Sequence, residues 1–288
     1  MQRVSSSDHQ QPPSAPVLDL LERYYDAVPR SGARVEDFGP LSLFVREGAG
    51  WPFYARPALG AAAGPVDVTD VARVRARQRE LGAPEAFEWV AETAPSLRAA
   101  VEASGLAVHE HPLMALDPAA STPQAVSGSG VTVRILGPED PALAGALAVP
   151  YLAFTEPGTE LGAAGPAELA EAILATTGDG SVERIAARIR SGLTSVAVAI
   201  ADGTALCAGQ HQPVGEVSEI VGVGTLPTAR RRGLAHAVTA ALVADARANG
   251  VRTVFLSAGD ENVARIYARL GFRRVGTALI AERPAADG

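Results

Sequence analysis

The sequence predicts an α/β protein with a mixed α+β sheet, arranged as two similar domains that are each a mostly antiparallel sheet flanked by helices. Three strand-like runs separated by turn residues follow one another in residues 194–227, which indicates an antiparallel meander. An amphipathic helix comes next, and residues 251–282 then read as strand, short helix, glycine and strand. The same order occurs in residues 82–116, which predicts that the two halves are related.

Composition limits both the size and the chemistry of the protein. The chain has 288 residues, a formal net charge of −7 and 47% hydrophobic residues, so one large or two ordinary domains can each bury a core. All of its basic residues are arginine, which excludes Schiff-base catalysis by lysine and a P-loop lysine. Neither half has more arginine than acidic residues, so we expect no nucleic-acid partner.

The sequence also predicts a compartment. No apolar run reaches membrane-spanning length, and the polar, proline-rich start has no signal-peptide core, so we expect a cytoplasmic protein without a membrane partner. Cys207 is the single cysteine, which excludes a disulfide within the chain. Its strand-like surroundings favour a small buried thiol.

Low-complexity segments set the expected boundaries. We expect a disordered tail over residues 1–16, a first domain over 17–118, a linker rich in Ala, Ser, Gly and Pro over 119–130, and a second domain over 131–284. The elements expected in the second domain, in chain order, are a strand at 131–136, a helix at 141–154, a glycine-rich loop at 155–166, a helix at 181–192, strands at 194–203, 204–214 and 217–227, a helix at 232–249, a strand at 252–259, a helix at 261–272 and a last strand, 273–282, that closes the sheet.

The segment TARRRGLAHA lies between the last strand of the meander and the long helix. The backbone N–H groups of a first helical turn are unpaired, and together with the helix dipole they attract an anion. Gly233 allows a phosphate to approach the backbone, and arginine guanidinium groups add charge-assisted hydrogen bonds. By itself the segment fits a solvated helix start as well as a pyrophosphate receptor.

Three segments in order resemble the GNAT (Gcn5-related N-acetyltransferase) family over residues 217–277: EIVGVGTLP, the Arg-x-x-Gly-x-Ala loop and IYARLGFRRVG. The resemblance implies acetyl-CoA as cosubstrate, no metal, and transfer of an acetyl group to an amine. It places the acetyl-CoA pyrophosphate on the loop residues, which are Arg230, Arg231, Arg232, Gly233, Leu234 and Ala235.

The resemblance also implies roles for residues on either side of the loop. Val223 and Thr225 match strand residues whose main-chain groups hold the pantetheine arm and the thioester carbonyl. Tyr267 matches the acid that protonates the departing thiolate, although a core aromatic would also fit its position. Glu219, eleven positions before Arg230, matches a general base, and a strand-start surface residue is the equal alternative.

One position departs from the family pattern. Asp260 stands where the family often has an asparagine that touches the pantetheine, and Asn262 follows two positions later. The resemblance makes both candidates for cofactor binding, while an aspartate at this position is also a good helix cap.

The first half resembles a degenerate GNAT domain in a tandem arrangement. When Gly105 is aligned with Gly271, Val101 stands opposite Tyr267, and no arginine–glycine loop precedes the helix of this half. His109 and His111 alternate along a strand without a third candidate ligand, so we expect surface histidines and no metal site.

The function predicted is an acetyl-CoA-dependent N-acetyltransferase acting on a primary amine of a small molecule. Glu156 and Glu160 in the loop 155–166 lie on the acceptor side by resemblance, where they suit a cationic amine. Two alternatives remain at this stage: a non-catalytic acyl-CoA-binding or regulatory protein, and a protein or peptide N-acetyltransferase. The oligomeric state is left open between a monomer and a homodimer.

Overall fold

A computed structural model describes residues 15–50, 52–60, 64–121 and 130–284. A helix begins at Ala15, within the last two residues of the segment predicted as a tail. The rest of that segment, Trp51 and most of the predicted linker lie outside the described residues. No helix in these ranges is long and apolar enough to span a membrane.

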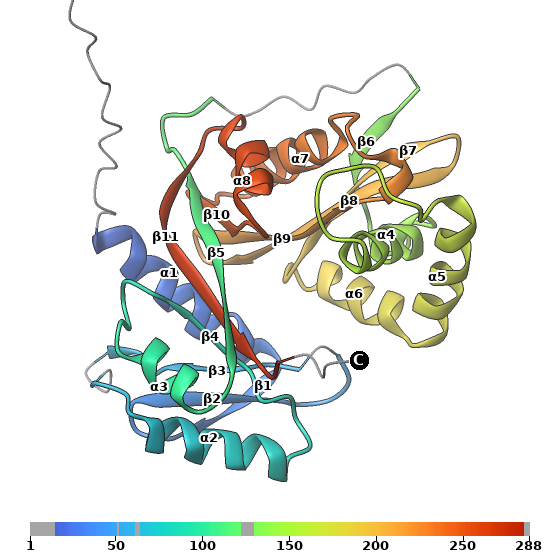
Figure 1. The fold of residues 1–288 in the computed structure, drawn as a ribbon. Helices are drawn as coiled ribbons and strands as arrows, with labels where there is room; N and C mark the ends of the chain where they lie inside the picture. The colour runs from blue at the N-terminus through green and yellow to red at the C-terminus, as the bar shows by residue number, and fades with distance from the viewer. Residues whose placement is uncertain (1–14, 51, 61–63, 122–129, 285–288) are drawn as a thin grey trace, which may run out of the picture.

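The described residues form helices on both sides of a single sheet (Figure 1). The helices are α1 (Ala15–Ala27), α2 (Val68–Glu80), α3 (Leu97–Ala103), α4 (Leu143–Thr155), α5 (Pro166–Gly178), α6 (Ser181–Arg190), α7 (Leu234–Ala248) and α8 (Glu261–Ala268). The strands are β1 (Ala33–Asp37), β2 (Leu41–Arg46), β3 (Ala55–Pro57), β4 (Phe87–Val90), β5 (Ala107–Leu116), β6 (Thr132–Ile135), β7 (Ser195–Ala201), β8 (Thr204–Val214), β9 (Val217–Thr225), β10 (Thr253–Ser257) and β11 (Phe272–Glu282).

Each half contributes one parallel strand pair to an otherwise antiparallel sheet. The strand order is β1-β2-β3-β4-β11-β5-β10-β9-β8-β7-β6. The pair β3–β4 is connected through α2, and the pair β9–β10 is connected through α7. The two halves therefore repeat one topology, and the predicted mixed sheet is confirmed.

The two halves exchange their last strands. β11 of the second half lies between β4 and β5 of the first half, and β5 lies between β10 and β11 of the second half. The antiparallel pair β5–β11 extends from Phe272 opposite Leu116 to Glu282 opposite Ala107, and Figure 1 shows these long strands crossing from one half to the other. The expectation that the last strand closes the sheet was wrong, because this strand lies in its interior.

Helix α1 packs across the junction of the halves. Its residues Leu18, Leu21, Tyr24 and Tyr25 form a buried cluster with side chains of β4, β5, β9 and β10. The sequence does not reveal that α1 packs at this junction, because α1 buries its apolar face only against strands that come much later in the chain. The halves thus share a core as well as a sheet.

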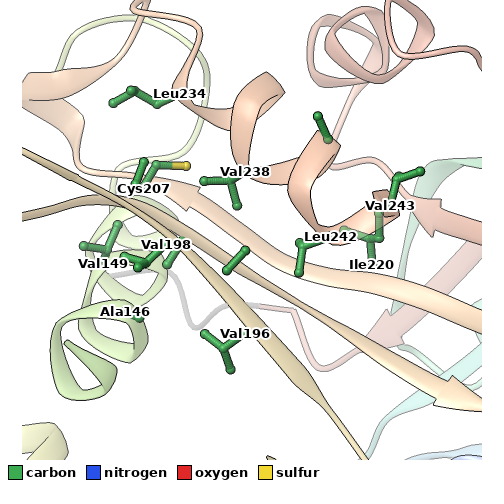
Figure 2. Close-up of a cluster of buried hydrophobic side chains, with 14 of the residues drawn as sticks. Ala146, Val149, Val196, Val198, Cys207, Ile220, Leu234, Val238, Leu242 and Val243 are labelled. Atoms are coloured by element: carbon green, nitrogen blue, oxygen red, sulfur yellow. The ribbon is translucent and has the colours of Figure 1, made fainter. Parts of the chain in front are cut away.

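The core of the second half lies on both faces of the meander. Figure 2 shows Ala146 and Val149 of α4 on one side of the strands, with Val238 and Leu242 of α7 on the other. The sequence did not predict α5, which buries only Leu169 and so carries a weak helical pattern. The other elements expected in this half lie within a few residues of their predicted bounds.

Candidate active site

A cleft opens where β9 and β10 part. The two strands pair in parallel only from Thr253 opposite Val217 to Phe255 opposite Glu219. Beyond Glu219 the backbone groups on that side of β9 have no partner in β10, so they can bind a ligand. The cleft has a volume of about 780 Å³ and is lined by the second half of β9, the start of α7 and one side of α8.

A bulge in β9 shapes the wall of this cleft. The register with β8 shifts between Ala208 and Gln210, and Gly222 adopts a left-handed conformation with φ of 62°. Val223 and Thr225 follow the bulge, and both line the cleft. The role that the resemblance implies for these two residues, holding an extended ligand, stays a prediction.

The N-terminus of α7 faces the cleft without a side-chain cap. Gly233 is the residue before the helix, with φ of 74°, and Ala237 N–H donates the first intrahelical bond to Gly233 O. The N–H groups of residues 234–236 therefore have no acceptor within the helix. Gly233, Leu234, Ala235 and His236 all line the cleft, so unpaired donors and the positive end of a helix dipole meet there.

Arginine side chains surround this helix end, as the sequence predicts, but not all are the expected ones. Arg231, Arg265 and Arg269 line the cleft, whereas Arg232 is exposed outside it. Arg231 forms an exposed ion pair of 2.7 Å with Glu160. The sequence analysis missed Arg265 and Arg269, although their spacing places them one helical turn apart on the helix that carries Tyr267.

Arg230 lines the cleft and also supports the loop after α4. Its guanidinium is buried and donates to Glu160 O and Ala153 O at 3.0 Å each, and also to Glu156 O. These hydrogen bonds hold the loop in place. The expected phosphate contact of this side chain stays a prediction.

Tyr267 of α8 lies in the wall of the cleft. It is 7% exposed, and its ring meets Phe272 edge-on at a centroid distance of 6.0 Å. Burial raises the pKa of Tyr267 well above its usual value, and proximity to Cys207 acts in the same direction. The hydroxyl therefore keeps its proton at neutral pH, which suits a proton donor.

Cys207 lies beside the site although it is distant in sequence. It pairs with Thr225 across β8 and β9, and Thr225 Oγ1 donates to its Sγ at 3.2 Å. Figure 2 shows the thiol among apolar side chains such as Leu234 and Val238. Burial raises the pKa of Cys207 to about 12, so the sulfur stays a protonated, weakly nucleophilic thiol.

Glu219 stands at the last paired position before β9 and β10 part. Its side chain is half-buried, does not line the main cleft, and accepts a hydrogen bond of 3.3 Å from the hydroxyl of Tyr25. Burial raises the pKa of Glu219 to about 8, the charge of Glu88 adds to this, and Tyr25 and Arg56 oppose it. A carboxylate with this proton affinity can accept a proton near neutral pH.

Comparison with known proteins shows a shared fold. Residues 196–280, from β7 to β11, match the model of the family described as FR47-like protein. A GCN5-related N-acetyltransferase from Kribbella flavida has a TM-score of 0.65 and 21% identity, with 95% of this chain and 98% of that chain covered. The chain has the GNAT fold.

Other solved structures agree with the tandem arrangement. A GNAT-family protein from Novosphingobium aromaticivorans has a TM-score of 0.54 and 18% identity, covering 94% of this chain and 100% of that one. A tandem GNAT protein from the clavulanic acid biosynthesis pathway has a TM-score of 0.52 and 18% identity, covering 86% and 79%. No curated protein matches the sequence significantly. The resemblance that the sequence predicts is thus confirmed for the fold.

Two acidic residues of the second half have structural roles. Glu156 accepts hydrogen bonds of 2.8 Å from Ala163 N and Ala164 N, and these bonds lower its pKa. It therefore closes the loop, and its contact with an amine acceptor stays a prediction. Asp260 accepts a hydrogen bond of 2.8 Å from Val263 N and caps α8 without lining the cleft, whereas Asn262 does line it. The expected ligand contact of Asp260 stays a prediction.

In the first half, the helix end that corresponds to the uncapped end of α7 is capped by a side chain. The start of α2 corresponds to that of α7, but here Asp67 accepts bonds from Thr69 N at 2.7 Å and Asp70 N at 3.0 Å. A carboxylate of the chain itself thus occupies the anion position. Val101, opposite Tyr267 in the alignment, is fully buried and apolar.

A Ser–His–Asp arrangement in the second half is not part of this site. His211 bonds to Ser218 Oγ and to Asp245 Oδ2, each at 2.9 Å. Ser218 and His211 are 0% and 1% exposed, so no substrate reaches the hydroxyl. The three residues join β8, β9 and α7 within the core. His109 and His111 form no metal group either, since the described ranges contain no cluster of three or more His, Cys, Asp or Glu side chains suited to a metal.

Proposed function

We propose that this protein is an acetyl-CoA-dependent N-acetyltransferase whose acceptor is a primary amine of a small molecule. The observation that carries the proposal is the cleft itself, where parted strands meet an uncapped helix N-terminus and Tyr267. The free N–H groups of residues 234–236, with Arg231, Arg265 and Arg269, suit a pyrophosphate. The unpaired edge of β9 suits the amides of a pantetheine arm.

The residues around the cleft can carry out transfer in a ternary complex. Glu219 accepts a proton from the amine, directly or through water, and the amine nitrogen then attacks the thioester carbonyl carbon. The backbone N–H of Val223 stabilises the negative charge that develops on the carbonyl oxygen. As the C–N bond forms and the C–S bond breaks, Tyr267 donates its proton to the departing thiolate.

An acceptor screen tests this function against its alternatives. Release of CoA from acetyl-CoA is measured with a panel of small amines and of peptides, with Tyr267→Phe as the control. Turnover with small amines supports the proposal, and turnover confined to peptides would replace the acceptor class. Tight acetyl-CoA binding without turnover on any acceptor would favour an acyl-CoA-binding protein. A homodimer stays a prediction.

Replacing Gly233 by valine is expected to weaken acetyl-CoA binding by about tenfold or more. Gly233 has φ of 74° and lines the cleft, so a branched side chain both strains the turn and enters the space in front of the free N–H groups. Calorimetric titration with acetyl-CoA measures the effect. Gly250→Val is the matched control, since Gly250 has φ of 85° at the other end of α7, outside the cleft. Equal loss of affinity in both variants would contradict the proposed receptor.

Replacing Cys207 by alanine is expected to leave turnover within about twofold of the original, because a thiol with a raised pKa carries no acetyl group. Steady-state rates and intact-protein mass spectrometry after incubation with acetyl-CoA alone provide the measurement. Direct transfer would be refuted by a stable acetyl adduct on Cys207, or by an alanine variant that binds acetyl-CoA normally but cannot transfer the group.

A further inference from the structure

The carboxylate of Glu219 is contacted by a side chain from the other half of the chain. Tyr25 of α1 donates its hydroxyl hydrogen to Glu219 Oε1 at 3.3 Å, across 194 positions of sequence. Tyr25 itself is 9% exposed and firmly held. Its ring meets Phe255 edge-on at 5.4 Å, and the guanidinium of Arg56 lies 5.2 Å from the ring centroid. The orientation of Glu219 therefore depends on α1.

A second carboxylate of the first half influences the charge of Glu219. Glu88 lies on β4, is half-buried, and its charge raises the pKa of Glu219. The nearby cation Arg56 forms a buried ion pair with Glu22, so its charge is already largely balanced. Burial raises the pKa of Glu88 to about 7, with Arg56 opposing. Two carboxylates thus share a poorly solvated region with little net positive charge.

Two further titratable groups near Glu219 are tyrosines that stay neutral. Tyr24 of α1 donates its hydroxyl hydrogen to Gln212 O at 2.8 Å, at the position of β8 opposite Glu219. Tyr54, just before β3, also interacts with Glu219. Burial raises the pKa of both tyrosines well above the usual value. The charge felt by Glu219 near neutral pH is therefore set mainly by Glu88 and Arg56.

We propose that Tyr25, from the half that lacks a phosphate receptor, is a positioning residue for Glu219 and favours its ionised form. The role of Glu219 as the base rests on the proposed function, whereas its coupling to the first half does not. The first half would then take part in the chemistry of the second half without binding acetyl-CoA.

The hydroxyl of Tyr25 and the charge of Glu88 change the pKa of Glu219 in opposite directions. A hydroxyl that donates to a carboxylate stabilises the ionised form, so removing it raises the pKa of Glu219. A neighbouring negative charge disfavours ionisation, so neutralising Glu88 lowers the pKa of Glu219. Because the two carboxylates are coupled, each measured pKa belongs to the pair of Glu219 and Glu88. The role of each residue is therefore read from the difference in pKa between variants.

The test compares Tyr25→Phe with Glu88→Gln, and Tyr24→Phe is the matched control. Tyr24 loses a hydroxyl from the same helix that contacts a main-chain oxygen and not the carboxylate. In Tyr25→Phe the acidic limb of the kcat–pH profile should move up by roughly 0.5–1 pH unit, and in Glu88→Gln it should move down by a similar amount. The control should leave the limb in place.

A second readout does not depend on activity. Carboxyl titration of the folded protein by infrared difference spectroscopy, with Glu219→Gln as the reference, follows Glu219 directly. Opposite shifts of this titration in the two variants support the inference even where no acceptor is turned over, which separates its failure from that of the proposed function. The absence of an upward shift in the folded Tyr25→Phe variant overturns it.

Discussion

Replacing Glu219 by glutamine is expected to lower kcat by about 100-fold or more, while acetyl-CoA affinity stays near its original value. The isosteric change removes the proton acceptor but leaves the cleft untouched, because Glu219 is not among the residues that line it. In the original protein the rate should rise with pH up to about 8, the pKa of Glu219, because the base acts in its ionised form. Steady-state kinetics from about two units below to about two units above that pKa and calorimetric titration provide the measurements.

The control for this prediction is Glu216→Gln. Glu216 is three positions away and forms only an exposed ion pair with Arg252, so its loss should change kcat little. A lower rate in Glu219→Gln would not reflect unfolding. A raised pKa means that the folded state holds a proton that the unfolded state releases, so Glu219 reduces stability as pH rises from about 4.5 to about 8. Near-normal kcat in Glu219→Gln would remove Glu219 from the mechanism.

Tyr267→Phe should lower kcat to a comparable extent for a different reason. The phenol donates its proton to the departing thiolate, so its loss leaves the rise of rate up to about pH 8 in place. In Glu219→Gln that rise should disappear. The two variants thus separate the two proton transfers by the shape of the profile as well as by its height.

The segments that form the cleft could be predicted, because each of them is a short contiguous stretch of sequence. The glycine before α7, the strand β9 and the position of Tyr267 on α8 are each encoded within a few residues, and the structure brings them to one cleft. The roles of individual side chains were harder to infer. Arg230 is buried and its neighbour Arg231 is exposed, and the burial of Arg230 depends on carbonyls some 70 positions earlier in the chain.

Strand neighbours and the surroundings of the base could not be predicted in the same way. A hydrophobic pattern indicates that residues 107–116 form a strand, but it does not indicate which strand lies beside it. Each of the strands β5 and β11 could pair with the edge of either half-sheet, because the two half-sheets are similar, and in this structure each pairs with the other half. The contact of Tyr25 with Glu219 depends on that exchange, since α1 packs over strands from both halves.

Residues 130–284, expressed without the first half, are expected not to reach the native fold. Without the first half, β5 is missing from between β10 and β11. Helix α1 is also missing from the buried cluster that contains Phe255 and Val217. Fully buried side chains such as Leu113 and Leu21 each contribute about 1.5–3 kcal/mol through burial. A domain of ordinary stability, about 5–15 kcal/mol, cannot lose several of them and stay folded.

Co-expression of both fragments, with the break placed between residues 121 and 130, is the control for this prediction. It breaks the covalent link but restores β5 and α1, so the pair should copurify, unfold in one transition and bind acetyl-CoA. Circular dichroism, thermal unfolding and calorimetric titration compare the pair with the second fragment alone. A second fragment that unfolds cooperatively and binds acetyl-CoA with full affinity would contradict the expectation. The first half would then be an attached domain, and its contacts with Glu219 would adjust a site that is complete without them.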